Sequence, residues 1–259
     1  MSRIAAAFAK CKAEKRAAFI PFIMGGDPSI EASAKLLDAL PAAGADIIEL
    51  GIPFSDPMAD GPTIQAAGLR ALEAGATLKK IIALAAEFRK KHVDVPLVLM
   101  GYLNPIFIYG YDAFARDAAA AGVDGVIIVD LPPEEAAELE PQLTKAGISL
   151  VRLIAPTSVP ERLPLLVKGA SGYLYFVSIT GITGAGSATN ADIEKNIAAI
   201  RKVTDLPVAV GFGVKTTEQV KAFGKLADGV VVGSAIVQKI FEHKGDVKAV
   251  SAYVASLAK

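Results

Sequence analysis

The sequence has few of the residues that build covalent or metal-bound scaffolds. It contains one cysteine, Cys11, so no intrachain disulfide can form, and a reducing compartment suits such a chain. It contains two histidines, His92 and His243, and both lie in charged helical stretches where we expect solvated side chains. With so few nitrogen and sulfur ligands, a metal site built on histidine or cysteine is not expected.

Two further absences narrow the class of protein. The 27 basic and 27 acidic residues leave no net charge, which argues against a nucleic-acid-binding or membrane-surface protein. No apolar run is long enough for a transmembrane helix, and residues 1–19 lack the apolar core of a signal peptide. Ile4, Phe8 and Cys11 instead have the spacing of an amphipathic helix. We therefore expect a mature, cytoplasmic protein.

What the sequence has in quantity is a repeated unit of apolar strand, polar loop and amphipathic helix. Runs that are apolar at nearly every position are typical of parallel strands buried on both faces. The predicted strands are 18–24, 46–51, 96–101, 125–130, 149–154, 172–178, 207–212 and 229–233. The helical patterns between and after them are 30–43, 63–91 with a break near Gly75, 113–121, 133–146, 160–168, 191–203, 216–226, 234–241 and 247–257.

This alternation predicts a single-domain α/β protein over residues 1–259, a (β/α)8 TIM barrel with an extra N-terminal helix. The 259 residues are close to the roughly 250 that such a barrel typically needs. The alternative is an open doubly wound sheet, which usually has a Gly-x-Gly-x-x-Gly turn after its first strand. The turn here is Met-Gly-Gly-Asp-Pro at 24–28, which does not match.

Two acidic residues come at the end of the second predicted strand. Glu49 lies inside the apolar run 46–51, where an unpaired carboxylate costs on the order of several kcal/mol, and Asp60 ends the following loop. Glu49 could simply pair with a buried base and Asp60 could cap the next helix. In a barrel, however, both acids would lie at the catalytic end, where a buried acid of raised pKa and a wetter, ionised acid suit acid–base chemistry.

Glycine-containing turns follow the last two predicted strands. Gly213 and the pair Gly233-Ser234 lie where backbone amides and a helix N-terminus bind phosphate in such barrels, although tight packing of loop on strand is the alternative. The loop 179–190, rich in Gly, Ser and Thr, is either a lid or a surface loop without a role. Tyr175, in the strand before it, either faces the barrel interior or packs as an ordinary tyrosine.

Five segments of the chain resemble the tryptophan synthase alpha subunit family. They are 22–28, 49–65, 100–105, 129–132 and 211–214, and the match runs in order from the first strand to Ser234. The segment 49–65 is the most specific of them. The resemblance implies a retro-aldol cleavage of indole-3-glycerol phosphate to indole and glyceraldehyde 3-phosphate.

The resemblance also implies roles for individual residues. Glu49 is the general acid and base, Asp60 accepts a hydrogen bond from the indole nitrogen, and Tyr175 lines the site near Glu49. Thr183 on the lid is expected to meet Asp60 on closure. The backbone amides expected to hold the phosphate are those of Gly184, Gly213, Gly233 and Ser234. The residues expected to form the indole slot are Phe22, Met100, Ile127, Val129, Leu153 and Phe212. Family members often carry leucine and alanine where this chain has Met100 and Val129, so the shape of the slot is expected to differ.

Finally, the resemblance implies a partner. Alpha subunits associate with a beta subunit that contains pyridoxal phosphate, in an alpha2beta2 complex, and pass indole to it, so no cofactor is expected in this chain. Pro53, Asp56 and Pro57 are expected at or near the interface, because their loop combines proline with apolar residues. A self-packed loop is the alternative. Other functions left open are a sugar-phosphate isomerase, a non-catalytic regulatory subunit and a stand-alone lyase that releases free indole.

Overall fold

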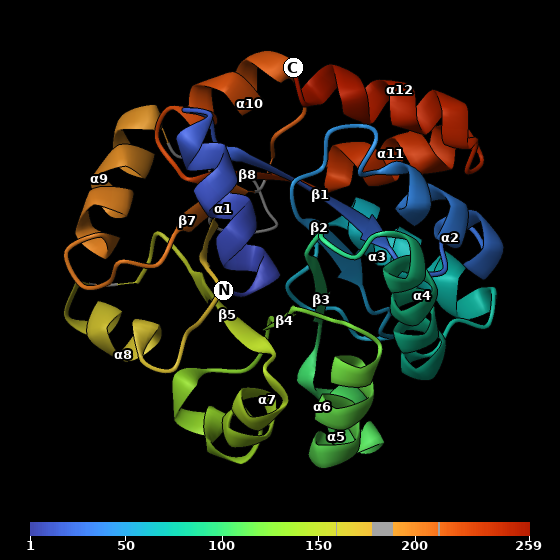
Figure 1. Cartoon of the computed structure of the whole chain (residues 1–259), viewed down its shortest axis with the longest axis horizontal. Helices are drawn as coiled ribbons and strands as arrows, with labels where there is room; N and C mark the ends of the chain where they lie inside the picture. The colour runs from blue at the N-terminus through green and yellow to red at the C-terminus, as the bar shows by residue number, and fades with distance from the viewer. Residues whose placement is uncertain (159, 178–188, 212) are drawn as a thin grey trace.

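The computed structural model describes residues 1–158, 160–177, 189–211 and 213–259, and in them eight parallel strands close into a barrel. Each strand pairs with the next in the chain, and β8 pairs with β1, so the predicted TIM barrel is confirmed. Helices surround the barrel on all sides (Figure 1). The strands are β1 Ala18–Met24, β2 Ile48–Gly51, β3 Leu97–Gly101, β4 Gly125–Ile128, β5 Ser149–Ile154, β6 Leu174–Val177, β7 Val208–Gly211 and β8 Gly229–Val232.

The helices follow the predicted pattern with two local differences. They are α1 Arg3–Ala13, α2 Ile30–Ala39, α3 Pro62–Glu73, α4 Leu78–Lys91, α5 Leu103–Tyr109, α6 Tyr111–Ala120, α7 Glu140–Ala146, α8 Leu163–Val167, α9 Asn190–Ile200, α10 Thr217–Gly224, α11 Ser234–Glu242 and α12 Val247–Leu257. Two of the predicted helices begin with the 3-10 turns Pro133–Glu138 and Pro160–Arg162. Helix α5 was not predicted, because Pro105 suggests a break. Pro105 lies in the first turn of α5, where a proline removes no hydrogen bond of the helix.

Helix α1 closes the N-terminal end of the barrel, as Figure 1 shows from that side. Ile4, Phe8 and Cys11 are buried, which confirms the predicted amphipathic helix. They pack into the interior of the barrel against side chains that lie on the strands or directly before them, among them Ile20, Ile47, Val98, Ile127, Val151, Tyr173, Ala209 and Val231. A second and larger apolar layer lies between the strands and the outer helices. The interior of the barrel is therefore a packed core, as is usual for this fold.

Before each even-numbered strand, one residue is hydrogen-bonded through its side chain and its backbone to the preceding strand, at the N-terminal end of the barrel. We call this arrangement a clasp. In every case the side-chain oxygen accepts a backbone N–H at 2.9 Å, and the N–H of the same residue donates back to the carbonyl of its partner. The pairs are Asp46 with Phe19, Asp124 with Leu97, Ser171 with Leu150 and Asp228 with Val208. The four clasps join β1 to β2, β3 to β4, β5 to β6 and β7 to β8.

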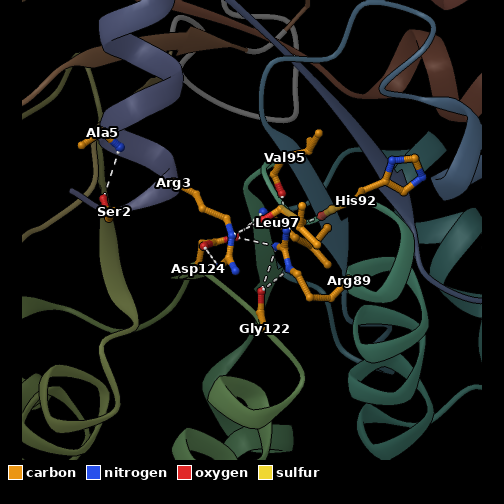
Figure 2. Close-up of polar contacts among 10 residues, drawn as sticks. Ser2, Arg3, Ala5, Arg89, His92, Val95, Leu97, Gly122 and Asp124 are labelled. Carbon is orange, nitrogen blue, oxygen red and sulfur yellow. Dashed lines mark hydrogen bonds and ion pairs between the residues drawn. The ribbon is translucent and has the colours of Figure 1, made fainter.

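Arginines neutralise the three clasping aspartates. Figure 2 shows Arg3 and Arg89 converging on Asp124, with nitrogen–oxygen distances of 2.9 Å and 2.7 Å. Arg89 also donates to the carbonyl of Gly122, so it ties α4 to the chain that enters β4. Arg16 and Arg201 pair with the other two aspartates. Every carboxylate in these clasps therefore has both a backbone donor and a cation.

The two histidines differ in their surroundings. Nε2 of His92 lies 2.7 Å from Oδ1 of Asp38, and its ring stacks on Phe88 at a centroid distance of 4.6 Å. The expectation of a solvated side chain is therefore wrong for His92, since the end of α4 packs against α2. It is confirmed for His243, which is exposed. No helix in the described part of the chain is long and apolar enough to cross a membrane.

Candidate active site

A cavity of about 420 Å³ opens at the C-terminal end of the barrel. The strands β1, β2, β3, β6 and β8 each contribute a side chain to its wall, and the loops after β2, β7 and β8 form its rim. Its lining residues are Phe22, Glu49, Asp60, Gly61, Pro62, Thr63, Ile64, Met100, Tyr175, Gly213, Lys215, Val231, Gly233 and Ser234. The structure thus brings together both predicted acids, Tyr175 and three of the predicted phosphate-binding residues.

Glu49 is fully buried in β2, between Phe22 of β1 and Val98 of β3 in the register of the sheet. The hydroxyl of Tyr173 donates a hydrogen bond to its Oε1 at 2.7 Å. Its Oε2 has no partner among the described residues, although Glu49 lines the cavity. Burial raises the pKa of Glu49 to about 8, and the bond from Tyr173 opposes this rise. The predicted upward shift is confirmed, and the alternative of a buried basic partner is wrong.

Asp60 lies on the loop between β2 and α3, and several bonds fix this loop. The N–H of Asp60 donates to the carbonyl of Pro57 at 3.0 Å, and Nε2 of Gln65 donates to the carbonyl of Asp60 at 2.8 Å. Burial raises the pKa of Asp60 to about 6, and a hydrogen bond with Tyr102 opposes the rise. Asp60 is therefore less exposed to solvent than the sequence predicted. It is still mainly ionised at neutral pH, whereas Glu49 is mainly neutral.

Two tyrosines on β6 and before it frame the buried acid. Tyr175 points into the barrel, and a Cβ added at Gly211 of β7 would collide with its hydroxyl. Only glycine therefore leaves room for this ring. Tyr173, which bonds to Glu49, was missed from the sequence. The signal was present, because residues two apart in a strand share a face, and Tyr175 was already a candidate.

The turns after β7 and β8 form the opposite part of the rim. Gly213 has a φ of +76°, a left-handed conformation that favours glycine. Ser234 is the first residue of α11. Its backbone N–H and those of the next residues in the first turn therefore have no acceptor within the helix. Lys215 lines the same cavity and was not among the predicted residues. This part of the cavity can bind an anion.

The remaining predicted site residues do not all reach this cavity. Phe22 and Met100 line it, and Ile127 belongs to the interior cluster against which Met100 and Leu153 pack. Val129 and Leu153 line a different cavity, of about 280 Å³, beside β4 and β5. Thr183, Gly184 and Phe212 lie outside the described residues.

Apolar side chains are exposed on the loop after β2, which carries Asp60 of the cavity, and on α5. Asp56 is exposed and Pro57 is half-buried, but Pro53 is buried, so it adds nothing to the exposed surface of its loop. Met58, on the same loop, is 68% exposed. Phe107 and Ile108, on α5, are 62% and 77% exposed and were missed with that helix. The loop and α5 are linked, because the hydroxyl of Tyr102 accepts the N–H of Ala59 at 3.0 Å.

A closed barrel with a neutral and an ionised carboxyl group in one apolar cavity defines an acid–base enzyme of the TIM-barrel class. Comparison with known proteins identifies the family. The model of the tryptophan synthase alpha chain family matches residues 8–259, and the chain belongs to this family.

Individual relatives agree with this assignment. A curated tryptophan synthase alpha chain from Rhizorhabdus wittichii is 56% identical over 243 residues, which are 94% of this chain and 90% of that protein. The crystal structure of tryptophan synthase subunit alpha from Legionella pneumophila str. Paris has a TM-score of 0.91 at 39% identity, covering 100% of this chain and 97% of that one. A chain of tryptophan synthase from M. tuberculosis, in the aminoacrylate-bound form, has a TM-score of 0.89 at 36% identity. The match covers 100% of this chain and 98% of that one.

The chain is therefore a lyase that cleaves indole-3-glycerol phosphate, the alpha reaction of tryptophan synthesis, and its indole passes to a beta subunit. The pyridoxal phosphate of the complex belongs to that beta subunit. This membership also removes the sugar-phosphate isomerase from the functions left open.

Proposed function

We propose that indole-3-glycerol phosphate binds in the cavity with its indole ring between Glu49 and Asp60, and that these two carboxyl groups carry out the cleavage. The observation that carries this proposal is the carboxyl group of Glu49. It is buried without a cation, its Oε2 has no partner in the described structure, and it lines the cavity. A group in that position costs stability, so it suits a role toward a ligand.

Glu49 acts first as acid and then as base. Its proton moves to the ring carbon that carries the side chain, and the ring becomes an indolenine cation. The carboxylate then takes the proton of the side-chain hydroxyl. The carbon–carbon bond breaks, its electron pair returns to the ring, and the hydroxyl carbon becomes the aldehyde of glyceraldehyde 3-phosphate. Glu49 ends the cycle protonated, which is the state that its pKa of about 8 favours at pH 7.

Asp60 stabilises the positive charge that develops on the ring. Its ionised carboxylate accepts the N–H of the indole, and this bond strengthens as the ring becomes cationic. The ring of Tyr175 closes the cavity beside Glu49 and holds the indole against it. We assign the indole slot to Phe22 and Met100, with Ile127 and Phe212 as further members; Val129 and Leu153 are left out, because they line the other cavity. Thr183 is assigned to meet Asp60 when the lid closes.

The phosphate is assigned to the turns after β7 and β8. The amides of Gly213, Gly233 and Ser234, with that of Gly184, are its proposed donors. The N-terminus of α11 directs its free N–H groups and the positive end of its dipole to the same place. The substrate is therefore held at its charged end while the reaction takes place at the other.

The assignment is tested with Glu49→Gln and Asp60→Asn, which keep the shape of each side chain. We expect losses of roughly a thousandfold and a hundredfold in kcat, while glyceraldehyde 3-phosphate still binds. Asp56→Asn is the matched control, because it changes an acid of the same loop that does not line the cavity. Release of indole without the beta subunit measures the effect. Near-normal turnover by either variant would remove that residue from the mechanism.

We further propose an alpha2beta2 complex in which the exposed apolar residues Met58, Phe107 and Ile108 contact the beta subunit together with Asp56 and Pro57. The exposed apolar side chains support this, since such surface is typical of protein interfaces, and Met58 lies on the loop that also carries Asp60 of the cavity. The mass of the complex in solution tests the stoichiometry, and any value other than two chains of each kind contradicts it. A cytoplasmic location is proposed from the unpaired thiol of Cys11, and cell fractionation tests it.

A further inference from the structure

We propose that Lys215 holds the phosphate of the substrate electrostatically and makes the site selective for phosphorylated over unphosphorylated ligands. The inference rests on the proposed function, because it takes the phosphate to lie at the turns after β7 and β8. It adds a side chain to a site that is otherwise assigned to backbone amides.

Lys215 is the one cation among the described residues that line the cavity. It comes two residues after Gly213 and shares the lining with Gly233 and Ser234. No acidic side chain in the described structure forms an ion pair with it. Its ammonium group is therefore available to a ligand, unlike those of Lys90, Lys91 and Lys239, which lie at 2.5–2.9 Å from carboxylates.

The backbone of Lys215 is held from two sides. Its N–H donates to Oε1 of Gln219 at 2.7 Å, as part of the capping box that begins α10. Its carbonyl accepts the hydroxyl of Tyr253, from α12, at 3.0 Å. These two bonds fix the root of the side chain at the rim of the cavity.

The charges of the cavity explain why a cation is needed. Asp60 is mainly ionised at neutral pH, so it repels a phosphate dianion that enters the same space. The glycine turns and the start of α11 offer dipoles but no full charge. The chain as a whole is neutral, so no general positive field attracts the substrate. A lysine at the phosphate end offsets the repulsion and supplies a full positive charge for a charge-assisted hydrogen bond to the phosphate.

The test uses the two products as inhibitors, since one carries phosphate and the other does not. In Lys215→Met we expect the inhibition constant of glyceraldehyde 3-phosphate and the KM of indole-3-glycerol phosphate to rise about fivefold. The inhibition constant of indole should stay unchanged. The difference should shrink as salt is added, because the site is open to solvent. Lys215→Arg should restore most of the affinity. Lys221→Met, on the exposed face of α10, is the matched control and should change neither constant.

The outcomes separate this inference from the function on which it rests. Near-normal turnover by Glu49→Gln or Asp60→Asn would refute the proposed function itself. If the wild type is active, unchanged constants in Lys215→Met overturn the role of Lys215. An equal change for indole and glyceraldehyde 3-phosphate, or an equal change in Lys221→Met, also overturns it, because a general disturbance or a long-range field would then account for the effect.

Discussion

At the N-terminal end of the barrel, Asp46, Asp124 and Asp228 each receive a backbone N–H and an arginine. At the other end, Glu49 and Asp60 in the cavity receive only tyrosine hydroxyls from the described residues. Both sets lie close to strand ends and are mostly shielded from water, except for Asp228, whose side chain is 41% exposed. The first set is fully compensated and the second is not. Burial raises the pKa of both members of the second set.

The contrast separates structural acids from functional ones. A buried carboxylate with a cation and a backbone donor costs stability when its partner is removed. A buried carboxyl group without a cation costs stability while it is present, and it shifts its pKa instead of ionising. Substitutions at the two ends should therefore have opposite effects on stability and on activity.

The largest effect on stability is expected at the N-terminal end, from Asp124→Ala. It leaves Arg3, Arg89 and the N–H of Leu97 without their acceptor, so the free energy of unfolding should fall by about 4 kcal/mol. The kcat of the folded variant should stay within about twofold, because the cavity lies at the other end of the strands. Urea unfolding and indole release measure the two effects. Asp94→Ala, an exposed acid nearby, serves as the control, and equal stability of both variants would refute the structural role.

A smaller effect of opposite sign is expected from Glu49→Gln. The pKa of Glu49 is raised from 4.5 to about 8 in the folded chain, so its contribution to stability is fully present below about pH 4.5 and is lost as the pH rises to 8. Glutamine does not titrate. The variant should gain stability relative to the wild type between pH 5 and 8, by about 3 kcal/mol. Urea unfolding over this pH range checks it, and parallel curves for the two proteins would contradict the raised pKa.

The smallest effect is expected on the pH dependence of kcat/KM in the wild type and in Tyr173→Phe. Activity should fall above about pH 8, where Glu49 loses its proton. It should also fall below about pH 6, where Asp60 gains one. The acidic limb overlaps with the titration of the substrate phosphate, which also has a pKa of about 6, so the alkaline limb is diagnostic.

Removing the hydroxyl of Tyr173 removes the bond that lowers the pKa of Glu49, so the alkaline limb should move up by roughly half a pH unit. Tyr109→Phe is the control, since its hydroxyl bonds to Asp117 on the outer surface. A limb that stays in place or moves down in Tyr173→Phe would show that Glu49 does not set it.

Features that depend on local sequence were predictable, and those that depend on distant contacts were not. The strand runs and the burial of Glu49 follow from neighbouring residues alone, so the barrel and its acid were found. The bond between Tyr173 and Glu49 joins residues 124 positions apart, and no local pattern encodes it. Val129 and Leu153 show the same limit, because period-two alternation does not decide which of two cavities a side chain reaches. Lys215 was missed because a lysine in a loop is usually only a solvated charge.

The side-chain clasps before β2, β4, β6 and β8 divide the barrel into four quarters of two strands each. In every quarter the alignment of the two strands is locked at the end remote from the ligand, and a slip by one residue would turn each inward side chain outward. The alignment of these strand pairs therefore does not depend on the loops of the opposite rim. Those loops are free to diverge in length and composition, as accommodating a second protein demands, without loosening the frame beneath them.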